Sequence, residues 1–149
     1  MSAMTDQATT TNTAELASHL RLAVTRLARK LRQQDEPGLT ASLLAALSTI
    51  ERAGAVTLGD LAAREQVQPP TMTRIVSALV DAGLVSRETD PADGRVAWVL
   101  PTAEGRRLLQ RSRRRKEAYL ARRLRDLSTE DLEVLERASS ILERLTEGR

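Results

Sequence analysis

Few side chains in this sequence of 149 residues could carry out chemistry. The chain has no cysteine and a single histidine, His19, which excludes disulfides, cysteine redox sensing, thiolate catalysis and cysteine–histidine zinc sites. Its seven glycines are scattered and form neither a phosphate-binding loop nor a GxGxxG motif. These absences disfavour an enzyme, and we expect neither a cofactor nor a metal site.

Arginine is the most abundant charged residue in the sequence. Lysine and arginine total 23 against 20 acidic residues, and every cation except Lys30 and Lys116 is an arginine. Guanidinium groups bind phosphate well, so the concentration of cations over 106–125 suggests a polyanionic partner. Such runs are more often solvated helix faces, and we favour that interpretation for residues 111–116. The expected partners lie in the last helix: Glu130, Asp131, Glu133 and Glu136.

The hydrophobic pattern predicts a mainly helical (α+β) fold. Residues 1–13 have almost no bulky apolar side chain and are expected to form a disordered tail. Helices are predicted over 14–36, over 39–52 and, from Pro101-Thr102, over about 102–126; a capping box, Ser128-x-x-Asp131, opens a last helix. The sequence has no membrane span and its first residues lack the features of a signal peptide, so we expect a cytoplasmic protein without membrane contact.

Residues 37–101 contain the pattern of a DNA-binding unit. Thr57-x-x-Asp60 is a capping box that opens a short helix, Pro69-Pro70 open a second helix, and Gly83 ends it. The apolar period then changes from 3.6 to 2 in residues 84–89 and 96–100, which predicts a β-hairpin around a turn at 90–95. Two helices joined by a tight turn and followed by a hairpin form a winged helix-turn-helix.

The second of these helices has one apolar and one polar face. At 100° per residue its apolar side chains fall together, and small polar groups around Arg74 fall opposite them. A face of this kind can enter a major groove, where hydroxyl groups contact base edges or phosphates. An ordinary amphipathic helix is the alternative. The predicted DNA contacts are Gln68, Pro70, Thr71, Thr73, Arg74 and Ser77.

The predicted hairpin carries Asp93-Gly94-Arg95 at its tip. An arginine on a projecting turn can enter a minor groove, and Asp93 is close enough to orient its guanidinium group. Asp-Gly-Arg alone is a generic turn sequence. Directly after a helix-turn-helix, it indicates a DNA-binding wing.

Apolar stripes at the two ends of the chain predict that two copies pair. One chain of this length would struggle to cover both stripes, whereas a twofold-symmetric dimer would cover them and match a palindromic operator. Packing within one chain is the alternative. The residues expected at the dimer interface are Leu16, Leu20, Leu132, Leu135, Leu142 and Leu145.

Over roughly residues 14–146 the sequence resembles the MarR (multiple antibiotic resistance regulator) family. The resemblance lies in Thr73-Arg74-Ile75 with Leu79, in Gly83-Leu84-Val85, in the wing residues Asp93 and Arg95, and in Thr102 with Gly105. The family pattern has leucine where this chain has Pro101. The resemblance implies a homodimer built from the first helix and the two C-terminal helices. It also implies a winged domain in each subunit and repression that a small ligand relieves.

Any such ligand is expected to be apolar or anionic and to lie between the dimer helices and the winged region. The candidates for its polar contacts are His19, Arg21, Arg26 and Tyr119, although His19 is more simply a surface or interface residue. The chain is therefore expected to be a sequence-specific, DNA-binding regulator of transcription. Two other classes remain open, a non-specific architectural DNA-binding protein and a winged helix that binds only proteins.

Overall fold

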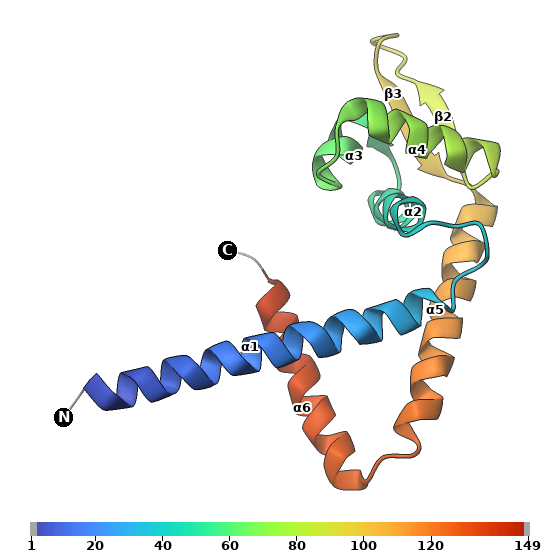
Figure 1. The fold of residues 1–149 in the computed structure, drawn as a ribbon. Coiled ribbons are helices and arrows are strands. Elements are labelled where there is room, and N and C mark those ends of the chain that lie inside the picture. Colours follow the sequence, from blue (N-terminus) through green and yellow to red (C-terminus); the bar gives the residue numbers. More distant parts are fainter. Residues whose placement is uncertain (1–2, 148–149) are drawn as a thin grey trace.

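The computed structural model describes residues 3–147, with side chains from residue 12 onward. Six helices and three short strands follow one another as α1 (Ala3–Arg32), α2 (Ala41–Ala53), β1 (Val56–Thr57), α3 (Leu58–Arg64), α4 (Pro69–Asp81), β2 (Val85–Thr89), β3 (Ala97–Pro101), α5 (Ala103–Leu124) and α6 (Thr129–Thr146). Elements α2 to β3 form what we call the winged unit, which lies at one end of α5, while α1 extends away from α5 (Figure 1). No described helix is long and apolar enough to cross a membrane.

The hydrophobic core lies in the winged unit. Its largest fully buried side chains come from α2, α3, α4 and β3: Leu47, Ile50, Leu61, Met72, Val76, Leu79 and Val99. Helix α5 adds Leu108 and Leu109 from its first turns. Neither α1 nor α6 contributes a buried side chain among the described residues. The winged unit is thus held by its own core, and α5 is anchored to it.

Threonine or serine side chains cap the N-termini of four helices. Thr40, Thr57, Thr102 and Ser128 each accept a hydrogen bond from the backbone N–H three residues later, as an N-cap does. Helix α4 has no side-chain cap at Gln68, and its first two residues are prolines. Those positions have no helical partner for an N–H, so the prolines cost nothing there. The predicted starts of α3, α4 and α6 are confirmed.

The hairpin is part of a three-stranded antiparallel sheet in the order β1-β3-β2. Strand β2 pairs with β3 from Val85 opposite Pro101 to Thr89 opposite Ala97. Strand β1, which the sequence analysis missed, places Val56 opposite Val99. A strand of two residues has no measurable alternation of apolar residues, so periodicity could not reveal it.

Pro101 does not disturb the junction between sheet and helix. It is the last residue of β3, and Thr102 then caps α5. The Thr102 N–H donates to the Leu84 carbonyl at 3.0 Å, and its hydroxyl lies 2.6 Å from the Gly83 carbonyl oxygen. The start of α5 is thereby tied to the segment that follows α4.

The first helix is longer than the sequence predicted. Helix α1 begins at Ala3, so residues 3–13 are helical where we expected a disordered tail, and residues 1–2 lie outside the described part. Extending a formed helix costs far less than starting one, because each added residue gains a backbone hydrogen bond. The amphipathic segment from residue 14 onward provides the nucleus, and the alanine, threonine and glutamine residues before it continue the helix.

Candidate nucleic-acid interface

Helix α4 presents the predicted polar face to solvent. Pro70, Thr73 and Arg74 are exposed, as is Gln68 just before the helix, whereas Thr71 and Ser77 are half-buried. The opposite side supplies Met72, Val76 and Leu79 to the core. The burial of these three residues fixes which way the helix faces, so the polar residues share one accessible surface.

Two hydroxyl groups on this face have different partners. The Thr73 hydroxyl donates to the Pro69 carbonyl one turn earlier, with 3.0 Å between the oxygens. The Ser77 hydroxyl oxygen instead accepts a hydrogen bond from Nη2 of Arg87, at 2.9 Å. Arg87 lies on β2 and is exposed. The sequence analysis missed Arg87, because no helix or strand periodicity relates it to a residue on α4.

Two aspartates build the tip of the hairpin. Asp90 Oδ1 accepts the N–H groups of Ala92, at 2.8 Å, and Asp93, at 3.2 Å, while its Oδ2 accepts Nε1–H of Trp98 at 2.8 Å. The hydrogen bond from Trp98, followed by that from Ala92, lowers the pKa of Asp90, so this carboxylate is ionised at neutral pH. Asp90 was not among the predicted site residues, although its position before a turn-forming proline is typical of an Asx turn.

The second aspartate holds the wing arginine. Asp93 Oδ1 accepts the backbone N–H of Arg95 at 3.0 Å and lies 3.3 Å from Nε of the same residue. The Arg95 side chain is still 92% exposed. Its guanidinium group is therefore oriented by a carboxylate but free to meet a ligand. The hairpin extends beyond α4 (Figure 1), so its tip and α4 belong to one end of the molecule.

Comparison with known proteins shows which family this chain belongs to. The MarR family model matches residues 39–97. A relative named as an uncharacterized HTH-type transcriptional regulator of Mycobacterium leprae is 42% identical over 130 residues, 87% of this chain and 91% of that protein. The chain belongs to the MarR family. A regulator of Mycobacterium tuberculosis is 41% identical, again over 87% of this chain and 91% of that protein.

Solved structures agree with the MarR assignment. A Pseudomonas aeruginosa protein described as a transcriptional regulator superposes with a TM-score of 0.84 and 33% identity, over 93% of this chain and 98% of that one. A MarR family protein from Bacillus stearothermophilus has the same fold, with a TM-score of 0.77, 24% identity and coverage of 92% and 96%. The protein is therefore a DNA-binding transcriptional regulator with a winged helix fold.

In this MarR protein, basic residues within 111–116 of α5 form ion pairs with acidic residues near the winged unit. Arg111 Nε lies 2.9 Å from Glu36, and hydrogen bonds to Glu36 and then Glu104 raise the pKa of Arg111. Lys116 Nζ lies 2.9 Å from Asp35. The expected pairing with acidic residues of the last helix is wrong in the part of the chain that the structure describes. The reason is spatial, because residues 111–116 lie beside the α1–α2 connection and α6 follows a turn at the far end of α5 (Figure 1).

A cavity of about 360 Å³ lies where the end of α1 meets α2 and α5. Three cations, Arg32, Arg113 and Lys116, line it together with the carboxylate of Asp35, which pairs with Lys116, and with apolar groups that include Leu44 and Leu109. The volume is in the range of small-molecule sites. Its lining is suited to a molecule with one anionic end and one apolar end.

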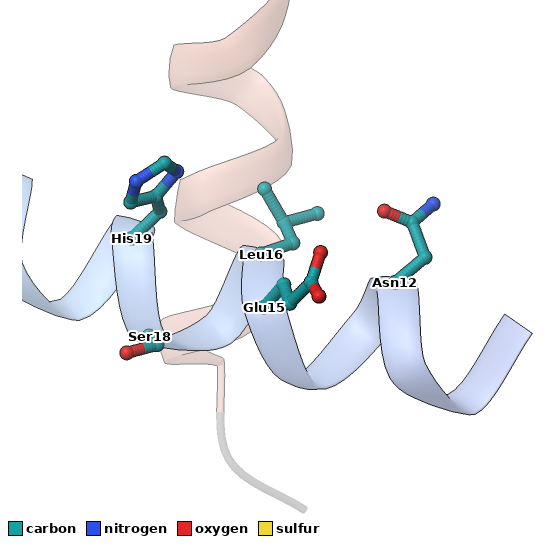
Figure 2. A pocket seen from close by; sticks show the side chains of 5 residues that line it. All are labelled: Asn12, Glu15, Leu16, Ser18 and His19. Carbon is teal, nitrogen blue, oxygen red and sulfur yellow. The ribbon is translucent and has the colours of Figure 1, made fainter. Parts of the chain in front are cut away.

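The predicted ligand contacts His19 and Tyr119 do not line this cavity. His19 shares a hollow on α1 with Asn12, Glu15, Leu16 and Ser18, as Figure 2 shows. Tyr119 lies on α5, with the guanidinium carbon of Arg123 5.2 Å from its ring centre. The two residues are thus on separate surfaces of one chain, and their assignment to a ligand stays a prediction. No cluster of histidine and acidic side chains in the described part of the chain could hold a metal ion.

The predicted dimer residues are uncovered in the single chain. Leu16 is 61% exposed and Leu145 68% exposed, and Leu132 and Leu135 are exposed as well. Leu20 and Leu142 are half-buried, and none of the described residues of α6 is fully buried. A soluble protein rarely leaves so many large apolar groups on two helices in water.

Proposed function

We propose that this MarR protein is a cytoplasmic, sequence-specific repressor that binds a palindromic operator as a homodimer. In each half-site, α4 would enter the major groove and the hairpin tip the adjacent minor groove. The observation that carries the proposal is the pairing of an exposed polar face on α4 with an exposed Arg95 that Asp93 orients. A Staphylococcus aureus MepR mutant whose structure is bound to an oligodeoxyribonucleotide has the same fold, with a TM-score of 0.69 and 20% identity.

The roles of the individual residues follow from their positions. Thr73, Arg74 and Ser77, on the outer face of α4, would contact base edges. Gln68 and Thr71, at the start of the helix, would contact phosphates, and Pro70 would pack against the backbone of the groove. The uncovered leucines of α1 and α6 would form the twofold interface that sets the spacing of the two half-sites.

Specific binding can be separated from non-specific binding by fluorescence anisotropy. The probes are the DNA upstream of the protein's own gene, a scrambled duplex of the same composition, and duplexes selected from a random pool. A repressor should prefer its best site by about 10³-fold or more, and salt should weaken binding to every duplex. Equal affinity for all of them, selected duplexes included, would favour the architectural alternative.

Arg95 provides the sharpest test of the wing. Replacing it with alanine should weaken operator binding by about 1–3 kcal/mol, because a guanidinium group inserted in the minor groove is lost. Arg95→Lys is the matched control. It keeps the charge but loses the planar donor fork, so its affinity should fall between those of the other two proteins. Unchanged affinity of Arg95→Ala, with the dimer intact, would remove the wing from the interface.

We also propose that a small anionic ligand in the α1–α2–α5 cavity releases the operator. The lining cations Arg32, Arg113 and Lys116 outnumber the one lining carboxylate, Asp35, which supports an anionic group, and the apolar lining supports the rest of the molecule. Arg113→Met should weaken binding of small aromatic or aliphatic carboxylates several-fold in calorimetry, because it removes a charged hydrogen-bond donor. Carboxylates that bind both proteins equally, or that bind without changing operator affinity, would contradict this mechanism.

A further inference from the structure

The hydroxyl groups of Thr73 and Ser77 lie one helical turn apart on the exposed face of α4. A hydroxyl has one hydrogen to donate and two lone pairs with which to accept, so either residue type can contact donors or acceptors on a base. The hydrogen bond that each hydroxyl already makes within the protein decides whether it is left to donate or to accept.

Thr73 has already used its hydrogen. Its hydroxyl donates to the Pro69 carbonyl at 3.0 Å, a back-bond that threonine commonly makes in helices. Only lone pairs then remain on the side of the oxygen that faces solvent. Thr73 can therefore accept a hydrogen bond from DNA without breaking a contact, and in the major groove the donors are the amino groups of adenine and cytosine.

Ser77 has used a lone pair of its oxygen and still has its hydrogen to donate. Its oxygen accepts Nη2–H of Arg87 at 2.9 Å, and within the described residues its hydrogen is not donated to another protein group. The positive guanidinium group also draws electron density from the oxygen, which makes the hydroxyl a better donor and a poorer acceptor. Ser77 is thus suited to the acceptors of the major groove, namely purine N7, guanine O6 and thymine O4.

We propose that Arg87 is a specificity-determining residue, which sets Ser77 as a hydrogen-bond donor to the operator while Thr73 acts as an acceptor. The proposal rests on the proposed binding of α4 in the major groove. Four residues of helix rise about 6 Å, more than the 3.4 Å between successive bases of one strand, so the two hydroxyls address different base pairs. Thr73 is then assigned the amino group of one base pair, and Ser77 an N7, O6 or O4 acceptor of another.

Selection from a random pool of duplexes tests this assignment with the full-length dimer. The variants are Thr73→Val, Ser77→Ala, Arg87→Met and the double variant of the last two, with Arg95→Ala as a control that acts in the other groove. Ser77→Ala and Arg87→Met should relax the same position by roughly two- to tenfold, the worth of one neutral hydrogen bond. The double variant should relax it no further, and Thr73→Val should relax a different position.

The outcomes separate this inference from the proposed function. If the wild-type protein selects no motif, the proposed operator binding is wrong. If it selects a motif but Arg87→Met lowers affinity equally for all sequences, Arg87 contacts phosphate and the specificity role is overturned. Relaxation of different positions by Ser77→Ala and Arg87→Met would overturn it too.

One measurement needs no protein variant. Where the position assigned to Ser77 is adenine, its 7-deaza analogue removes the N7 acceptor; where it is guanine, 7-deazaadenine paired with thymine removes both N7 and O6. Where it is thymine, cytosine paired with guanine exchanges the O4 acceptor for an amino group. Wild-type affinity should fall by roughly two- to tenfold in each case. Equal affinity for the natural and altered duplexes would show that Ser77 is not a donor to that base.

Discussion

Replacement of Gly105 by alanine is expected to destabilise the winged unit by about 3 kcal/mol, the upper end of the range for overpacking a core. A Cβ atom at this position would lie 2.1 Å from the Leu84 carbonyl oxygen and 3.3 Å from Cδ1 of Leu47. The oxygen belongs to the backbone and cannot rotate away. The same carbonyl also accepts the N–H of Thr102, so relief of the clash would separate α5 from the segment after α4.

Gly59 offers a matched control for this prediction. It lies inside α3, and a Cβ added there has no neighbouring atom within 4 Å. Gly59→Ala should therefore raise stability by about 0.5–1 kcal/mol, because alanine favours the helix over glycine. Urea unfolding at one fixed protein concentration measures both variants, since the stability of the proposed dimer depends on concentration. A Gly105→Ala protein as stable as the parent would mean that α5 does not dock as closely as the structure shows.

Features that depend on local chemistry could be predicted from the sequence. The N-caps at Thr57 and Ser128 are examples, because their hydrogen bonds reach only three residues along the chain. The two faces of α4 are another, since helical rotation alone separates Met72 and Val76 from Thr73 and Arg74. The contact between Asp93 and Arg95 also lies within one turn.

Contacts between distant parts of the chain could not be predicted in this way. The partners of Lys116 and Arg111 are Asp35 and Glu36, in a connection that the sequence marks only by a turn. Charge patterning cannot choose between this connection and the acidic last helix, because both supply carboxylates. The Arg87–Ser77 hydrogen bond likewise needs the sheet to be placed beside α4. That placement comes from the core, and no spacing along the chain encodes it.

Leu135→Glu is expected to convert the proposed dimer into monomers. Leu135 lies on α6, where it is 43% exposed in the single chain, and none of the helix's described residues is buried. A carboxylate buried without a partner costs several kcal/mol, so the dissociation constant of the dimer should rise at least about 100-fold. Sedimentation at micromolar concentration measures the change. Operator affinity should fall with it, because a monomer contacts only one half-site.

Arg137→Glu is the matched control, because it introduces the same side chain two residues further along α6, on the opposite side of the helix. It should leave the dimer intact. Thermal unfolding of the winged unit should still be cooperative in Leu135→Glu, since that core contains no residue from α6. A monomer with an intact winged unit would then bind one half-site weakly and retain the base preferences of the dimer. If Leu135→Glu remains dimeric while Arg137→Glu dissociates, the subunits pair through the other face of α6, and the leucine stripe must have a different partner.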